Sequence, residues 1–184
     1  PGGGGHGMGA GDVNADGRVD FVFPGGWFEA PEKPYEGEWV WHPELTLCGD
    51  ASVPILVHDV NEDGLPDIIV GHGHDYGLDW WEQGKGADGG RTWTAPREMS
   101  VGSGRINVMQ AGLLRIGDRI FCFFSVRDAK DHAGKYLIES RDGGETWSER
   151  RRITPEVGYY TGANDRALRL KSGRILLPCH IRVN

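Results

Sequence analysis

Two copies of one acidic loop constrain this chain more than any other feature of its sequence. Residues 12–20 read Asp-Val-Asn-Ala-Asp-Gly-Arg-Val-Asp, and residues 59–67 read Asp-Val-Asn-Glu-Asp-Gly-Leu-Pro-Asp. The copies are 47 residues apart (59 − 12 = 47). Each copy leads into a short run of apolar, strand-forming residues, and Asp/Asn-Gly sequences form tight turns between strands. The chain is therefore expected to repeat a β-rich unit.

A second repeat follows in the C-terminal half. Residues 88–93, Asp-Gly-Gly-Arg-Thr-Trp, recur as residues 142–147, Asp-Gly-Gly-Glu-Thr-Trp, at an offset of 54 residues (142 − 88 = 54). Repeats of roughly 40 to 50 residues that hold several strands are typical of propeller blades. Because acidic loops dominate before Gly84 and Trp repeats dominate after it, we place one module at residues 1–84 and another at residues 85–184.

Composition favours an all-β fold. The chain has 30 glycines and 7 tryptophans among 184 residues, which suits tight turns between short strands that bury large rings. No apolar run with helical spacing exceeds two turns. We expect blades of antiparallel four-stranded sheets, one of them built from residues 107–116, 119–126, 135–140 and 147–154. Residues 167–170 and 174–181 are expected to begin the next blade. Three to four blades would be a fragment of one or two propellers, because closed propellers have about 4 to 8.

Charge and hydropathy exclude several classes of protein. The formal net charge is −7, which argues against a nucleic-acid partner because phosphates need a basic surface. No run of 18 apolar residues exists, so no transmembrane helix is expected. Three cysteines, Cys48, Cys122 and Cys179, are too few and too widely spaced for a disulfide framework or a zinc site. We interpret them as small buried apolar residues.

The acidic loops are candidate calcium sites. Calcium binds 6 to 8 oxygen ligands in flexible geometry, and each loop clusters carboxylates around a glycine that allows a sharp turn. The loops are not EF-hands, because Phe23 and Val70 occupy the twelfth position, where a bidentate Glu is required. The alternative is a pair of metal-free hairpin turns. The expected ligands, including the backbone carbonyls of residues 18 and 65, are Asp12, Asn14, Asp16, Arg18, Asp20, Asp59, Asn61, Asp63, Leu65 and Asp67.

These loops resemble the FG-GAP or VCBS repeat. The resemblance covers roughly residues 6–83 and includes the segments 26–31 and 79–82, which are similar to those of secreted bacterial members. It implies propeller blades of the integrin-α type, with Ca²⁺ bound in the acidic loops. It also implies an extracellular, periplasmic or cell-surface location.

The C-terminal Trp repeats resemble the Asp box, or BNR repeat, of sialidases. Residues 140–147 match Ser-x-Asp-x-Gly-x-Thr-Trp at every fixed position, while the earlier copy has Gly86 in place of Ser. In that family these boxes are structural and lie away from the active site. The resemblance covers roughly residues 88–181 and implies an exo-α-sialidase type of glycoside hydrolase, which binds the sugar carboxylate with arginines. The first arginine of that cluster, in an Arg-Ile-Pro setting, has no counterpart here.

Four residues are candidates for sialidase-type catalysis. Asp131 and Asp165 are possible acids, Arg166 suits an anion, and Tyr160 could act as a nucleophile. The alternatives are a solvated loop acid at 131, a local ion pair at 165–166 and a packing ring at 160. A transition-metal pair at His72 and His74 is a weaker possibility, because no further ligands accompany it.

Two functional hypotheses follow. The first is part of a secreted sialidase-like glycoside hydrolase that acts on terminal sugars of glycans. The second is a non-catalytic, calcium-dependent surface module that binds a glycan, a glycoconjugate or a protein.

Overall fold

The protein is a stack of antiparallel β-sheets. The computed structural model describes residues 7–47, 51, 54–74, 77–99, 106–162 and 165–182, so Cys48 and Asn164 lie outside the described residues. Within those ranges there is no helix, and hence none that could span a bilayer. The all-β prediction is confirmed. The described strands do not close into a barrel or propeller, so the propeller remains a prediction.

The first two sheets are four-stranded antiparallel units. The N-terminal sheet has the order β1 (Gly9–Gly11), β2 (Asp20–Phe23), β3 (Gly26–Glu29) and β4 (Val40–His42). Each acidic loop joins the first two strands of its sheet, so residues 12–19 connect β1 to β2. The turn residues chosen from the sequence therefore lie between paired strands, as Asp/Asn-Gly chemistry requires.

The central sheet repeats this plan. Its order is β10 (Arg97–Glu98), β7 (Leu78–Trp81), β6 (Asp67–Gly71) and β5 (Leu56–His58). The hairpin of β8 (Gln83–Lys85) and β9 (Arg91–Trp93) is inserted between β7 and β10, and its turn is the first Trp repeat. This sheet therefore takes strands from both sides of residue 84, where the sequence suggested a module boundary.

The C-terminal sheet is larger than a four-stranded blade. Its first three strands match the expectation closely, and two later strands extend it in the order β11-β12-β13-β15-β18. β15 joins β13 through a single parallel bridge, Ala133 to Tyr159. The strands are β11 (Asn107–Ile116), β12 (Arg119–Ala129), β13 (His132–Ser140), β14 (Arg151–Arg152), β15 (Tyr159–Gly162) and β18 (Cys179–Arg182).

Two strand predictions in this half need correction. The expected fourth strand, residues 147–154, runs antiparallel beside β13 but forms a ladder only at β14. Residues 174–181, expected as one strand of a next blade, are divided into β17 (Ile175–Leu176), which pairs with β16 (Leu168–Arg169), and β18, which pairs with β15. Pro178 lies at the break, and proline cannot donate a ladder hydrogen bond. Cys179 is exposed rather than buried, whereas Cys122 is buried as expected.

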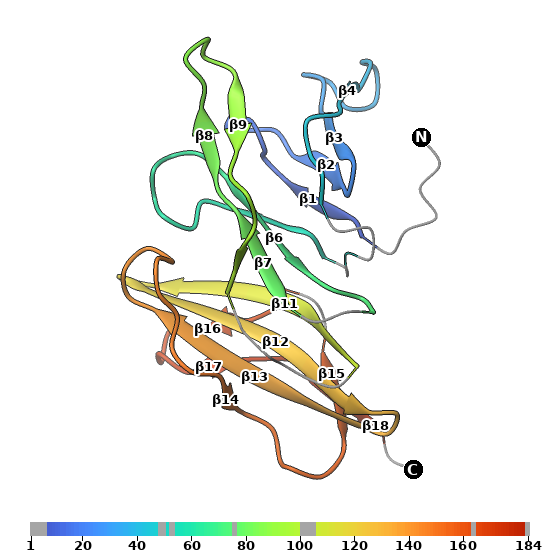
Figure 1. The fold of residues 1–184 in the computed structure, drawn as a ribbon, viewed down its shortest axis with the longest axis vertical. Helices are drawn as coiled ribbons and strands as arrows, with labels where there is room; N and C mark the ends of the chain where they lie inside the picture. Colours follow the sequence, from blue (N-terminus) through green and yellow to red (C-terminus); the bar gives the residue numbers. More distant parts are fainter. Residues whose placement is uncertain are drawn as a thin grey trace.

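The core lies between the sheets, and β6 is buried on both faces. Ile68 and Val70 face the N-terminal sheet, in a cluster with Val22 and Trp27. Ile69, between them, faces the C-terminal sheet and packs in a second cluster. Figure 1 shows β6 and β7 between the blue N-terminal strands and the yellow and orange C-terminal ones. Alternating side chains of one strand thus stabilise two interfaces.

The Asp-box turn of residues 140–147 packs against the central sheet. A Cβ at Gly144 would lie 2.8 Å from both the Trp80 ring and the Val60 side chain, whereas one at Gly143 would approach Asn61 no closer than 3.6 Å. Both glycines are left-handed, with φ of 91° and 69°. The contact between the sheets therefore depends on Gly144 in particular.

We expect Gly144→Ala to destabilise the protein more than Gly143→Ala. Both variants place a side chain at a left-handed position, at a cost of about 1–2 kcal/mol. Only Gly144→Ala also overpacks the interface, which adds about 1–3 kcal/mol. Urea unfolding of the two variants measures the difference. Equal losses of stability would show that the turn does not press on Trp80.

Candidate metal-binding loops

The two acidic loops have the same backbone conformation. Ala15 and Gly17 have φ of 59° and 86°, and the equivalent Glu62 and Gly64 have φ of 63° and 84°. A non-glycine residue with positive φ is uncommon, so its recurrence at the same position is informative. One folded loop is therefore used twice.

The side-chain oxygens of each loop converge on one backbone amide. The Asp16 N–H donates to Asp12 Oδ1 at 3.0 Å and to Asn14 Oδ1 at 3.2 Å. In the second loop the Asp63 N–H donates to the oxygens of Asp59 and Asn61, each at 3.2 Å. The glycine N–H donates to the other oxygen of the first aspartate in both loops, at 2.7 and 2.9 Å. The loops thus hold hard oxygen donors close together.

The last aspartate of each loop is buried and closes it. Both oxygens of Asp20 accept backbone hydrogen bonds, from Val13 at 2.9 Å and from Ala30 at 2.8 Å. Asp67 accepts from Val60 at 3.0 Å and from Gln83 at 2.9 Å. Burial raises the pKa of Asp20, and it raises that of Asp67 to about 6, against the opposing effect of the N–H groups. A cation nearby would favour the ionised form of both carboxyls.

The loops differ at the seventh position. Arg18 folds back onto its own loop, forms an ion pair with Asp16 and donates from Nε to the carbonyl of Ala30 at 2.8 Å. Leu65 occupies the equivalent position in the second loop and has no charge. Arg18 pairs with Asp16, one of the proposed ligands, whereas Arg115 at the second loop pairs with Glu62, which is not one. The second loop is therefore the better place for a metal ion.

The donor set has the chemistry of a calcium site but not a closed cage. The side chains at positions one, three and five can ligate a cation only through oxygen, the ligand atom that Ca²⁺ prefers. Among the described residues, no three His, Cys, Asp or Glu side chains are grouped so as to hold a metal ion. The reason is visible in each loop, where Asn takes the third position and the last aspartate turns inward to the backbone. Each carboxylate oxygen that accepts one N–H retains a second lone pair for a cation.

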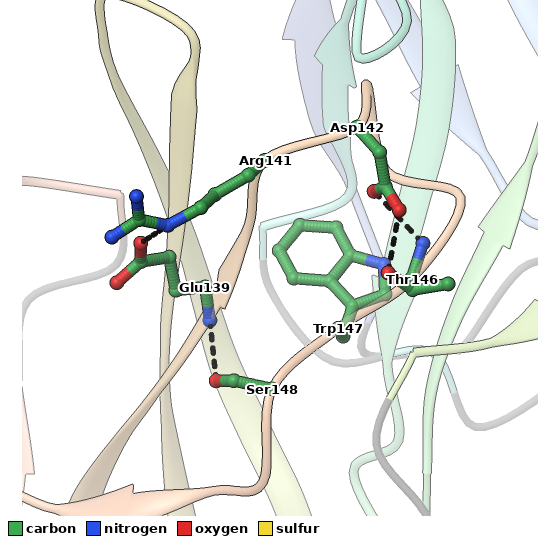
Figure 2. A pocket seen from close by; sticks show the side chains of 6 residues that line it. All are labelled: Glu139, Arg141, Asp142, Thr146, Trp147 and Ser148. Carbon is green, nitrogen blue, oxygen red and sulfur yellow. Dashed lines mark hydrogen bonds and ion pairs between the residues drawn. The ribbon is translucent and has the colours of Figure 1, made fainter.

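The Asp box is a hydrogen-bonded turn. Figure 2 shows Asp142 facing Thr146, whose N–H donates to Asp142 Oδ1 at 2.9 Å and whose hydroxyl donates to Oδ2 at 2.5 Å. The Ser140 hydroxyl donates to the same carboxylate at 2.8 Å. These bonds, those of Thr146 first, lower the pKa of Asp142 to about 2. Among the described residues, the hydrogen-bond partners of Asp142 are Ser140 and Thr146 of its own turn, which agrees with a structural role.

The depression beside this turn is open to solvent and is lined by polar side chains together with the Trp147 ring. Figure 2 shows the ion pair of Arg141 with Glu139 at 2.7 Å and the bond from the Glu139 N–H to Ser148 Oγ at 3.0 Å. Trp147 packs against the core between the central and C-terminal sheets. The lining residues are Glu139, Arg141, Asp142, Thr146, Trp147 and Ser148. The Thr146 hydroxyl lies against the Asp142 carboxylate, but a carboxylate with a pKa of about 2 is too weak a base to activate it.

The strand register keeps the predicted catalytic residues apart. Asp131 lies at the exposed tip of the β12–β13 hairpin, whereas Asp165 lies against β11 at Gly112, opposite Phe123. Ala129, beside the hairpin tip, is six positions along β12 from Phe123, which corresponds to about 20 Å along a strand. Asp131 and Asp165 therefore lie far apart. Tyr160 pairs with Ile181 in β15 and is half-buried, and Arg166 is exposed beside Asp165. Within the described residues the four do not converge on one site.

Asp165 has the most unusual geometry of these candidates. Its φ is 41°, and its Oδ1 accepts the Leu113 N–H at 3.0 Å. Its charge opposes the depression of the His58 pKa, which is caused first by burial and then by Arg115. An exposed carboxylate in a left-handed backbone, close to a histidine and an arginine, is a feature found at functional sites.

Sequence reasoning missed a buried polar cluster in the C-terminal sheet. Lys135 is 1% exposed, and its Nζ donates to Gln110 Oε1 at 3.4 Å. The same oxygen accepts from the Ser125 hydroxyl at 2.8 Å and from the Gly162 N–H at 3.1 Å. Gln110 has φ of 60° at the irregularity between Met109 and Gly112, and burial lowers the pKa of Lys135 to about 8. The sequence signal for this cluster is Lys135 itself, a charged residue within a strand of otherwise alternating pattern.

The histidine pair is not grouped as a metal site in the described residues. His72 Nε2 lies 2.9 Å from Asp79 Oδ2, across the β6–β7 pairing.

Comparison with known proteins adds no assignment, because the chain matches no protein-family model, no curated protein and no solved structure.

The Asp142 carboxylate should stabilise the fold in a pH-dependent way. Its pKa is lower in the folded protein than the ordinary 3.8, so its contribution is complete above that value and is lost as the pH falls toward 2. The melting temperature of Asp142→Asn should therefore lie below that of the wild type at pH 7, and the gap should narrow between pH 4 and pH 2. Asp118→Asn, in an exposed hairpin turn, is the control. A gap that stays constant down to pH 2 would contradict the role of the charge.

Proposed function

We propose that this chain is a calcium-stabilised, propeller-type repeat region of a secreted or cell-surface protein that acts on glycans. The repetition of one loop supports this proposal above all else, since the same hydrogen bonds and the same left-handed residues recur at both sites. The resemblance to FG-GAP or VCBS repeats supports the calcium, and the resemblance to the Asp box supports the glycan. The all-β stack of sheets is compatible with blades of a propeller.

Calcium would act at the contacts between sheets. Gln83 Nε2 donates to the carbonyl of Val13 at 3.0 Å and to that of Pro66 at 2.6 Å, so one side chain joins the two loops. Arg115 donates to the carbonyl of Val60 at 2.5 Å and pairs with Glu62 at 3.0 Å, which ties the second loop to the C-terminal sheet. A cation held by Asp12, Asn14 and Asp16, or by Asp59, Asn61 and Asp63, would neutralise carboxylates and stiffen these contacts.

A glycoside hydrolase is the second candidate function. The strained, exposed Asp165 favours it, with Arg166 beside it as the anion contact. The strand register of the C-terminal sheet places Asp131 far from both Asp165 and Arg166. Catalysis in the sialidase manner would then need Asp165 as the acid and Tyr160, which lies in β15 between β13 and β18, as the nucleophile.

Calcium should raise the melting temperature, and the second loop should account for most of the rise. A ligand that binds only the native state stabilises it by about 2.7 kcal/mol at a hundredfold excess over Kd. Asp63→Asn should remove more of the calcium-induced rise in melting temperature than Asp16→Asn, because Asp16 is already paired with Arg18. Arg18→Leu copies the second loop and should strengthen calcium binding at the first.

Thermal unfolding with excess calcium and with a chelator measures these shifts, and Asp142→Asn is the control. No shift in the wild type would reduce both loops to metal-free turns. Larger effects from Asp16→Asn than from Asp63→Asn would contradict the role of Arg18.

The hydrolase candidate predicts a difference between two acids. Asp165→Asn retains an acceptor for the Leu113 N–H but loses the proton, and should slow hydrolysis of a fluorogenic sialoside about hundredfold or more. Asp131→Asn should leave the rate unchanged. No turnover by the wild type, or equal rates for all three proteins, would reject the hydrolase and leave the calcium proposal intact.

A further inference from the structure

The outer face of the N-terminal sheet consists of aromatic rings. Strand alternation directs Val22 and Trp27 inward, to the core shared with the central sheet. The same alternation directs Phe21, Phe23, Phe28 and Trp41 outward, and every outward side chain of β2, β3 and β4 is Phe or Trp. Trp39, two residues before Trp41, adds a fifth ring. We call these five residues, Phe21, Phe23, Phe28, Trp39 and Trp41, the aromatic face.

The rings form a continuous, partly exposed surface. Phe21 stacks on Trp39 with centroids 5.1 Å apart, and Phe28 lies 4.7 Å from Trp41. Phe23 meets Phe28 edge-on at 6.0 Å. Phe21 also pairs directly with Phe28 across the two strands, which joins the groups. Phe21 is 39% exposed, the other four are half-buried, and none belongs to the three buried clusters of the described residues.

The positions of the two tryptophans are set by the backbone around them. The Trp39 indole N–H donates to the carbonyl of Pro34 at 3.2 Å, so its polar edge is already satisfied and its ring is oriented. The Trp41 ring lies over Gly26, where a Cβ would come within 2.7 Å of it. Rings that are oriented before a ligand arrives lose little entropy on binding.

This face differs from the interfaces between sheets in the same molecule. Those interfaces combine aliphatic side chains, such as Ile68 and Ile69 of β6, with single rings such as Trp80, whereas every outward side chain of β2, β3 and β4 is a ring. Figure 1 shows the N-terminal sheet at the end of the stack. The aromatic face is on the side of this sheet opposite Val22 and Trp27, which pack against the central sheet. An exposed apolar patch of this kind marks a binding surface, and its composition is unlike that of the sheet contacts seen here.

The charges beside the face indicate an uncharged ligand rich in hydroxyl groups. The segment that carries Trp39 and Trp41 has three glutamates, Glu32, Glu36 and Glu38, against one lysine, Lys33. Glu29 and Glu44 belong to the inner side of the sheet, where they pair with Arg18 and Arg91. Carboxylates accept hydrogen bonds from sugar hydroxyls, and they repel carboxylate or phosphate groups on a ligand. The C–H groups on one face of a pyranose ring fit the negative face of an aromatic ring.

We propose that the aromatic face binds a neutral chain of hexopyranose or pentopyranose rings by stacking them on Phe21, Trp39 and the neighbouring rings. This assignment goes beyond the calcium loops and does not depend on them. It also differs from a sialoside site, because the acidic segment disfavours sugars that bear a carboxylate.

Affinity electrophoresis of the full chain in native gels tests the proposal. The gels contain, one at a time, neutral β-linked glucan, mannan, galactan or xylan, or the anionic polymers polygalacturonate and polysialate. At least one neutral polymer should retard the wild type, and neither anionic polymer should. No retardation by any neutral polymer, or retardation only by the anionic ones, would overturn the proposal.

Variants locate the binding surface. Phe21→Ala and Trp39→Ala should each weaken binding about fivefold or more, the lower end of what one stacking ring contributes. Trp39→Leu keeps apolar volume and should lose binding while melting near the wild-type temperature. Leu168→Ala, which alters a residue 57% exposed in β16, is the matched control and should bind normally.

Sedimentation of the same proteins separates a glycan from a protein occupant. The wild type should behave as the same species as Trp39→Leu. Self-association that disappears in Trp39→Leu, together with no retardation in any neutral gel, would assign the aromatic face to a second copy of the chain and reject the glycan.

Discussion

Burial of β6 on both faces is the constraint on which the rest of the structure depends. This strand, Asp67–Gly71, directs Ile68 and Val70 to one sheet and Ile69 to the other. Removing either neighbour would expose apolar surface at a cost of about 25 cal/mol for each Å². The central sheet therefore cannot be stable alone, and the three sheets form a single stack. The acidic loops and the Asp box follow from that stack, because they lie where its sheets meet.

The buried carboxylates connect this packing to the loops. Asp67 begins β6 and is fully buried, and its oxygens accept from the backbone of Val60, near the start of the second loop, and from that of Gln83, at the start of β8. Asp20 does the same at the start of β2. The hydrogen bonds of a buried aspartate therefore hold each loop in shape without a bound ion. A cation would add to an arrangement that the backbone already holds, which explains how a turn and a metal site can share one sequence.

The two ends of the stack differ in chemistry. The N-terminal end presents the aromatic face, while the C-terminal sheet covers part of its outer face with the β16–β17 hairpin, over Phe121 and Phe123. Between them, Gln83 and Arg115 join the loops to neighbouring sheets. The two proposals therefore use different surfaces, with calcium at the loops between the sheets and the glycan on the rings at one end.

Local sequence determined the turns and the longest strands of this protein, because alternating apolar residues and Asp/Asn-Gly turns act over a few positions. It placed β11, β12 and β13 closely and identified both loops, whose conformation depends on their own side chains. It could not place Asp131 relative to Asp165, since their separation follows from the register of β11 on β12. It also did not show the inward turn of Asp20 and Asp67, or the shared oxygen of Gln110 beside Lys135. Those features were decided by tertiary structure, because burial and pairing between distant strands determine which polar atoms lose water and which partners replace it.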